Sequence, residues 1–200
     1  GHWIMHSDFA EPLRLAKQFA ENASILAGDH LHTLMPMQPP PYAEPEVTDR
    51  ITVHTFFPGG GLRKAVNIGV VSPHRCKLSE IPKFFARSDI KANVVLLQVS
   101  VPNDRGQVSL GVSVDYMPEV LAQKPIIVAQ INRQMPFTYG DGIINLSDID
   151  YAIEVDEPIV EFPVSVADAV DQMIAEHVAS LVDDGDVVQA GIGALPDAVL

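Results

Sequence analysis

Two long apolar segments, residues 93–101 and 125–131, constrain the fold of this chain more than any other feature of its sequence. A strand with water on one face alternates apolar and polar residues, and neither segment alternates in that way. Nearly continuous Val, Ile and Leu is typical of strands buried on both faces, as in parallel sheets covered by helices. The two segments therefore predict the centre of such a sheet.

The rest of the chain alternates between strand and helix patterns. Further strands are predicted at residues 51–57, 68–71, 151–155 and 186–190. Helices are predicted from an Asp8 N-cap to Gly28, at 62–67, from a Ser79 N-cap to residue 87, at 117–123 and at 165–182. Residues 36–45 are rich in proline and are predicted to be an extended connection. This order predicts an α/β fold with an open, mostly parallel sheet flanked by helices.

Charge and cysteine content exclude several classes of protein. The 200 residues include 13 Lys and Arg against 26 Asp and Glu, a formal net charge of −13. Such an acidic chain lacks the basic surface that binds nucleic-acid phosphates, so we expect no nucleic-acid partner. The single cysteine, Cys76, excludes an intramolecular disulfide framework.

No apolar run is long enough for a transmembrane helix, so we expect no membrane partner. Residues 1–6 lack the basic region and apolar core of a signal peptide, and their sequence leaves open whether they are native or appended. We therefore expect an enzyme that is cytoplasmic or lies in an organelle matrix.

The strongest local signal for a binding site is a glycine-rich turn near residue 200. It consists of Gly191, Ile192, Gly193, Ala194 and Leu195, and it follows the strand predicted at 186–190. Two glycines before a helix let backbone amides approach an anion such as a pyrophosphate. A tight turn without a ligand explains the same residues equally well.

A second candidate site follows the buried strand predicted at 125–131. The residues are Asn132, Gln134, Met135 and Pro136. Ligands of open α/β sheets bind at the carboxyl ends of strands, which favours a substrate pocket here. Anchoring of a loop through side-chain hydrogen bonds is an equally good interpretation.

Other chemistry-bearing residues favour a structural interpretation. Residues 59–61, before Arg63 and Lys64, are predicted to form a turn rather than an anion cradle. Cys76 follows His74 and Arg75, which would lower its pKa, but packing explains a lone cysteine better than catalysis. The spacing of the histidines does not suggest ligands, so no metal is expected; those considered are His30, His32, His54 and His177.

Several motifs taken together resemble one family. They are residues 63–69, 78–82, 98–100, 109–115, 132–140, 148–150, 154–158 and 189–200, in that order. In order and spacing they resemble the acetyl-CoA hydrolase/transferase family over roughly residues 50–200. Phe137 departs from the Arg or Trp that this family often shows there, and the proline-rich segment replaces a glycine-containing turn.

The resemblance implies two similar open α/β domains that hold coenzyme A between them. It implies ping-pong acyl transfer through a glutamyl-CoA thioester, with the turn at Gly191–Leu195 contributing to CoA binding. The family glutamate follows that turn by roughly two dozen residues, so we expect it beyond Leu200, and no catalytic residue is assigned within residues 1–200.

The expected function is therefore that of the N-terminal domain of a CoA-transferase. Its substrates would be an acyl-CoA such as acetyl-CoA and a small carboxylate, and its partner the C-terminal domain of the same protein. A homo-oligomer is also expected. Acetyl-CoA hydrolysis is the alternative within the family, and a non-catalytic CoA- or nucleotide-binding module is the alternative outside it.

Overall fold

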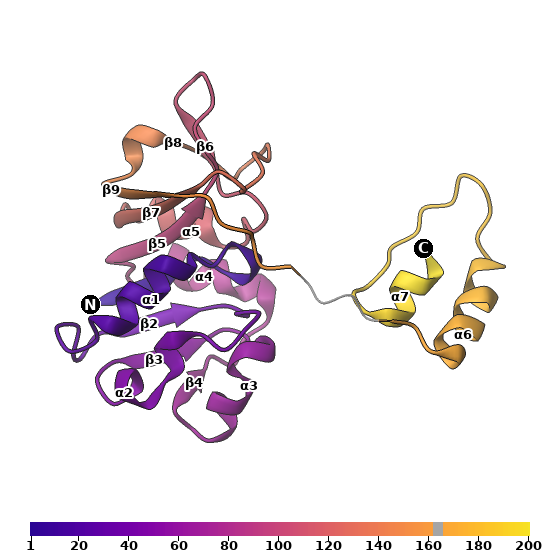
Figure 1. Ribbon diagram of the computed structural model, residues 1–200, viewed down its shortest axis with the longest axis horizontal. Helices are drawn as coiled ribbons and strands as arrows, with labels where there is room; N and C mark the ends of the chain where they lie inside the picture. The colour runs from indigo at the N-terminus through magenta and orange to yellow at the C-terminus, as the bar shows by residue number, and fades with distance from the viewer. Residues whose placement is uncertain (162–165) are drawn as a thin grey trace. The chain divides into compact units, whose positions relative to one another are not determined.

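The computed structural model describes residues 1–161 and 166–200, which fall into two compact units, Gly1–Val160 and Glu161–Leu200. The larger unit is built on a seven-stranded sheet (Figure 1). None of the helices in the described residues is long and apolar enough to cross a bilayer.

All neighbouring strands of this sheet run parallel. From one edge to the other they are β4 (Val71–Pro73), β3 (Thr52–Thr55), β2 (His30–Thr33), β1 (His2–Met5), β5 (Val94–Val99), β7 (Ile126–Asn132) and β9 (Tyr151–Val155). A separate antiparallel pair joins β6 (Gln107–Ser109) to β8 (Ile143–Asn145). The predicted fold class, an open parallel sheet with flanking helices, is confirmed.

Helices cover both faces of the sheet because successive side chains of each strand point to opposite faces. One face packs against α1 (Leu13–Glu21), α2 (Pro45–Thr48) and α3 (Gly59–Asn67) through a core that includes Met5, Leu31 and Leu96. The other packs against α4 (Ile81–Ala86) and α5 (Met117–Ala122). Short 3-10 turns lie at η1 (Asp8–Ala10), η2 (Pro41–Ala43), η3 (Leu78–Glu80) and η4 (Leu146–Asp148).

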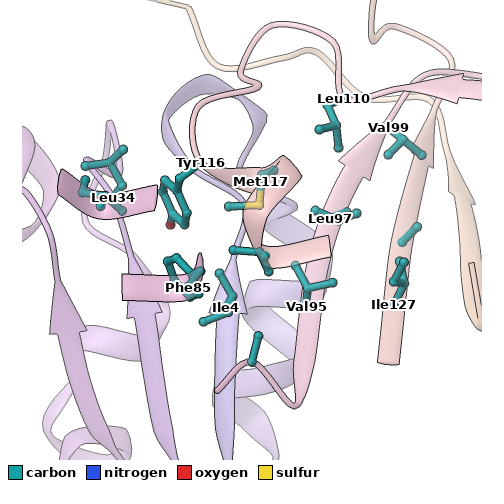
Figure 2. Packing of buried hydrophobic residues seen from close by; sticks show 14 of the residues in the cluster. Ile4, Leu34, Phe85, Val95, Leu97, Val99, Leu110, Tyr116, Met117 and Ile127 are labelled. Carbon is teal, nitrogen blue, oxygen red and sulfur yellow. The ribbon is translucent and has the colours of Figure 1, made fainter. Parts of the chain in front are cut away.

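The α4 and α5 face has an aromatic centre. Phe85 and Tyr116 stack with ring centroids 5.4 Å apart and lie over the sheet beside Ile4 (Figure 2). Leu97 and Val95 of β5 supply the apolar surface beneath them. The mostly apolar segments 93–101 and 125–131 thus contain most of β5 and β7, the strands that pair over six positions.

The sequence patterns missed strands β1 and β2. In β2, His30 and His32 alternate with Leu31 and Thr33, so its apolar content is low. β1 is apolar except for His2, but four residues are too few to show a strand periodicity. Residues 2–5 are nevertheless the central strand, paired with β2 on one side and β5 on the other. Structurally, this segment is therefore integral to the fold.

Several predicted helix ends are wrong. Asp8 does not cap a helix, because its backbone adopts φ +53° and α1 begins after Pro12. That helix ends at Glu21 rather than continuing to Gly28. Ser79 lies inside η3, and α4 begins only at Ile81 with Pro82 in its first turn. Side-chain hydrogen bonds in these loops are directed to tertiary partners or neighbouring turns, which local patterns do not reveal.

The smaller unit contains α6 (Ala169–Ala179) and α7 (Ala194–Val199). Asp168 caps α6 by accepting hydrogen bonds from the amides of Val170 and Asp171, whereas the predicted cap, Ser165, lies outside the described residues. The strand predicted at 186–190 is wrong, because those residues have no strand partner among the described residues of this unit. A strand needs a neighbour to satisfy its backbone hydrogen bonds.

The three consecutive glycines begin a helix and do not form the predicted turn. Gly59–Asn67 is helical, and the first turn of α3 lies against the backbone of the proline-rich segment. A Cβ at Gly61 would lie 2.3 Å from the Gln38 carbonyl oxygen. At Gly60 the nearest atom would be 3.9 Å away. Close backbone packing therefore requires a glycine at position 61.

This difference gives a matched pair of substitutions. Gly61→Ala is expected to lower the free energy of unfolding by about 1–3 kcal/mol, because the backbone of α3 or of the proline-rich segment must move. Gly60→Ala is expected to raise it by up to about 1 kcal/mol through helix propensity. Urea unfolding followed by the fluorescence of Trp3, the single tryptophan, measures both. Equal effects of the two substitutions would contradict the packing argument.

Candidate functional site

The sheet has one topological switch point, between β1 and β5. From β1 the chain proceeds through β2, β3 and β4 on one side and then returns to β5 on the other. In open α/β sheets, ligands bind in the crevice outside the carboxyl ends of the strands at such a point. Residues that follow β1 to β4 meet at this edge and line a pocket there.

This pocket, hereafter the edge pocket, has a volume of about 320 Å³. Its apolar walls are Leu34, Met35, Phe56, Phe57, Leu78 and Ile81, and its other lining residues are Asp8, Cys76 and Asp115. Ile81 is 1% exposed, whereas Phe57 and Leu78 are 53% and 66% exposed. The pocket therefore has a buried apolar floor and an open apolar rim.

Two carboxyl groups form the polar end of the edge pocket. Burial, the charge of Asp115 and a hydrogen bond to Asp115 together raise the pKa of Asp8 to about 7. Asp8 is therefore partly protonated close to neutral pH. The Ser7 hydroxyl donates a second hydrogen bond to Asp115 at 2.6 Å. Raised carboxyl pKa values in a cleft are typical of functional sites.

Backbone strain is concentrated around the same pocket. Asp8, Met35 and Asp115 have φ values of +53°, +45° and +42°. Residues other than glycine rarely adopt this region, which costs about 1–3 kcal/mol when the surrounding structure imposes it, and least for Asp and Asn. The fold thus holds three pocket residues in left-handed conformations, with the greatest strain at Met35.

His6 connects the two sides of the switch point. Its Nε2–H donates to the Ser113 carbonyl at 2.7 Å, and its Nδ1 accepts from the Gln98 amide at 3.2 Å. These partners require the neutral ring protonated at Nε2. Burial lowers the pKa of His6 to about 4. The ring thereby ties the end of β1 to β5 and to the loop that carries Asp115.

His6 should make the larger unit sensitive to acid. Its pKa is about 6.5 in an unfolded chain and about 4 in the fold, so the unfolded state takes up the proton first as pH falls. The stability that depends on the neutral ring is intact above pH 6.5 and is lost progressively down to pH 4, by up to about 3 kcal/mol. We expect His6→Asn to remove this loss.

The measurement is the free energy of unfolding from urea titrations between pH 7.5 and 4, followed by Trp3 fluorescence. Asp8 and Glu11, whose pKa values are raised to about 7 by burial first of all, stabilise the fold as pH falls. Their effect occurs in both proteins and largely cancels in the difference. His177→Asn, at an exposed position of α6, is the matched control. A pH dependence that is unchanged in His6→Asn would contradict the assignment.

The residues predicted after the second buried strand lie where expected, at the carboxyl end of β7. Asn132 is fully buried, and both ends of its amide are used. Its Nδ2 donates to Gln98 Oε1 at 2.9 Å and to the Glu157 carbonyl at 2.8 Å. Its Oδ1 accepts from the amides of Gln134 and Glu157. These bonds favour the loop-anchoring interpretation of Asn132, and a substrate contact stays a prediction.

The other three residues of this group differ in burial. Gln134 is exposed and donates to Asp156 at 2.8 Å, and Pro136 is exposed. Met135 is 3% exposed and fills the space above Gly111, where a Cβ would lie 2.0 Å from the Met135 sulfur. The edge pocket is not lined by any of these residues.

A buried amide network lies beneath the start of α1, next to Asn132. Gln98 Oε1 accepts from Gln130 Nε2, and Gln98 Nε2 donates to the Glu11 carbonyl. The Arg14 amide, one of the free donors at the start of α1, binds Gln130 Oε1 at 3.1 Å. Adjacent parallel strands therefore support the first turn of α1 through side chains. Apart from polar residues within apolar runs, no sequence pattern indicates this network.

Gly191, Ile192, Gly193, Ala194 and Leu195 lie in the smaller unit. Gly193 has φ +133° and precedes α7, as predicted for a turn that opens a helix. A Cβ at Gly191 would lie 3.7 Å from Pro196, an ordinary contact. The turn therefore requires glycine at 193 for its conformation, whereas Gly191 is not required by sterics within this unit. CoA binding by these residues stays a prediction.

Sequence spacing did not reveal a histidine array on the larger unit. The rings of His2, His30, His32, His54 and His74 stack across neighbouring strands, with centroids of His32 and His54 4.7 Å apart. His32 Nε2 lies 2.9 Å from His2 Nδ1, and its Nδ1 lies 3.2 Å from His74 Nε2. No group of three or more metal-ligating side chains among the described residues has the geometry to hold a metal.

The expectation for Cys76 was wrong in direction. Burial and the nearby charge of Glu80 raise the pKa of the Cys76 thiol, although His74 and Arg75 precede it. The thiol lies 3.9 Å from the His74 carbonyl oxygen. A thiol with a raised pKa is a poor nucleophile at neutral pH.

Comparison with known proteins assigns the chain to a family. Residues 11–165 match the acetyl-CoA hydrolase/transferase N-terminal domain. The chain belongs to this family. Its resemblance to the family, based on motifs between residues 50 and 200, is thereby confirmed.

The chain is similar to curated CoA-transferases along nearly its whole length. It is 35% identical to the 4-hydroxybutyrate coenzyme A transferase of Clostridium kluyveri, covering 95% of this chain and 44% of that protein. It is 37% identical to the succinyl-CoA:acetate/propanoyl-CoA:succinate CoA transferase of Fasciola hepatica, and the match covers 98% of this chain and 41% of that protein. The chain thus spans less than half the length of these relatives.

Solved structures have the same fold. RipA from Yersinia pestis matches with a TM-score of 0.89 and 26% identity, over 99% of this chain and 48% of that one. The 4-hydroxybutyrate CoA-transferase of Porphyromonas gingivalis matches with a TM-score of 0.71 and 29% identity, over 99% of this chain and 46% of that one.

Proposed function

We propose that this chain is the N-terminal part of a CoA-transferase that moves CoA between an acyl-CoA and a small carboxylate. The match of residues 11–165 to the family domain carries this proposal. The edge pocket at the switch point supports it, because it offers a small apolar site where α/β sheets bind ligands. The acyl group of acetyl-CoA or of a similar short acyl-CoA suits a pocket of this size.

In this proposal the acyl group is transferred through a glutamyl-CoA thioester, and the glutamate belongs to a C-terminal domain outside residues 1–200. Covalent catalysis by a carboxylate divides one difficult acyl transfer into easier steps. The share of the relatives that the chain covers supports this division. So does the edge pocket, whose acidic lining residues are the aspartates Asp8 and Asp115 rather than a glutamate.

The proposed CoA contacts are Gly191, Ile192, Gly193, Ala194 and Leu195. Asn132, Gln134, Met135 and Pro136 are proposed to shape the substrate side, with Asn132 acting through the loop that it anchors. CoA is a substrate here, and no metal is required. We further propose a cytoplasmic homo-oligomer.

Acetyl-CoA hydrolysis is the second candidate function, because the family includes hydrolases. The two reactions differ in the acceptor, which is water in one and a carboxylate in the other. A CoA-binding module without chemistry would bind CoA and catalyse neither reaction.

The first experiment separates these alternatives. The 200-residue chain and a longer protein that continues into the C-terminal domain are incubated with acetyl-CoA, with and without a carboxylate such as butyrate. We expect the longer protein to form the new acyl-CoA and the 200-residue chain to form none, because it lacks the nucleophile. Turnover by the 200-residue chain would overturn the assignment of the glutamate, and release of free CoA alone would favour the hydrolase.

The second experiment tests the glycine turn in the longer protein. Gly191→Ala is compatible with the fold, since its Cβ makes only an ordinary contact with Pro196. We expect it to weaken CoA binding at least tenfold, about 1.4 kcal/mol, if CoA approaches the backbone there. Gly193→Val is expected to weaken CoA binding more than it lowers stability, although its φ of +133° adds backbone strain of about 1–3 kcal/mol.

CoA titration by calorimetry, with a melting curve for each variant, measures both effects. Gly185→Ala is the control, because Gly185 also has a positive φ and open space around its Cβ but lies outside the turn. If both turn variants bind CoA like the wild type while melting earlier, the turn is structural and the CoA assignment is wrong.

A further inference from the structure

The edge pocket combines two features that together restrict what it can hold. Its volume of about 320 Å³ is at the small end of the range for ligand sites, about 300–1,000 Å³. Its floor and rim are apolar, with Phe56 and Ile81 buried and Phe57 and Leu78 open to solvent. Such a site fits a short aliphatic group that enters from the rim.

The polar end of the pocket has one sign of charge. Asp8 and Asp115 line it, and Lys and Arg are absent from its lining. Asp8 Oδ1 is buried without a hydrogen-bond donor from another residue, and the hydroxyl of Ser7 is directed to Asp115. The polar end of the pocket therefore offers carboxyl oxygens and no cationic side chain, in an apolar surrounding. A carboxylate placed beside it would meet like charge at low dielectric.

We infer that the edge pocket takes the distal end of a short, uncharged acyl chain, and that Asp8 and Asp115 select a hydroxyl and reject a carboxylate at that end. A hydroxyl can donate to Asp8 Oδ1, which has no other donor, whereas a carboxylate has no proton to donate and carries a negative charge. A distal methyl group gains only apolar contact. This inference rests on the proposed function, because the acyl chain is taken to be that of the CoA-transferase substrate.

The test uses three amides that differ only at the distal end and contain no CoA: butyramide, 4-hydroxybutyramide and succinamate. Binding to the 200-residue chain at pH 7 is followed by NMR through the methyl groups of Met35 and Ile81. We expect 4-hydroxybutyramide to bind more tightly than butyramide, and succinamate to bind at least about tenfold more weakly than butyramide, as expected for like charges brought together.

The double variant Asp8→Asn/Asp115→Asn removes the charge. Asparagine tolerates the left-handed backbone conformation of both positions, so the substitution adds little strain. We expect succinamate to bind the variant about as well as butyramide does, and the advantage of 4-hydroxybutyramide to shrink. Asp141→Asn, at an exposed position outside the pocket lining, is the control and should leave the order unchanged.

Three results would overturn the inference: wild-type binding of succinamate as tight as that of butyramide, probe-induced shifts that avoid Met35 and Ile81, or an order that the double variant does not change. The first two use only the wild-type chain, so they hold even if the variant does not fold. Failure of the longer protein to bind CoA would count against the proposed function but would not change the relative affinities of the three amides for the edge pocket. A reversed amide order with CoA binding intact would overturn the pocket assignment alone.

Discussion

The four-residue strand β1 holds the site together because it is paired on both sides. Trp3 is in register with Leu31 of β2 and with Val94 of β5, so the two halves of the sheet meet on this strand. Its continuation, His6, forms two hydrogen bonds that fix where the chain turns. Ser7 and Asp8 are thereby brought to Asp115, more than a hundred positions later in the sequence. Without this pairing the polar end of the edge pocket would not form.

Near this edge, the two faces of the sheet are stabilised by different kinds of interaction. Towards α1, buried amides of Gln98, Gln130 and Asn132 satisfy one another and supply acceptors to the start of the helix. A fully connected network of this kind positions a loop without leaving buried polar groups unpaired. On the face that packs against α4 and α5, apolar and aromatic contacts dominate. Most residues that line the edge pocket follow the carboxyl ends of β1 to β4, and one of these, Leu78, lies in η3.

The buried acids weaken the fold at neutral pH. Burial raises the pKa values of Asp8 and Glu11 to about 7, so ionising either group in the folded protein is unfavourable. The strained backbone at Asp8, Met35 and Asp115 adds to this cost. Such features persist when a site needs them and the surrounding packing compensates. The apolar core on both faces of the sheet provides that compensation.

The smaller unit shows how far a local pattern can determine structure. Gly193 and the start of α7 follow from residue types, since a positive φ and a helix start are local properties. The predicted strand at 186–190 is absent because strand formation needs a partner, and Val187, for example, is fully exposed. Hydrogen bonds between strands are a property of tertiary structure, and the described residues of the smaller unit do not supply a strand partner among themselves.

The sequence by itself determined the fold class, the strands β5 and β7, and the carboxyl-end position of Asn132, because nearly continuous apolar runs are typical of strands covered on both faces. The ordered motifs also identified the family. Only the tertiary structure decided that residues 2–5 form the central strand, since four residues are too few to show a strand pattern by themselves. The tertiary structure alone brought Asp8 next to Asp115 and stacked histidines from neighbouring strands. These contacts depend on strand order and register, which local sequence spacing does not encode.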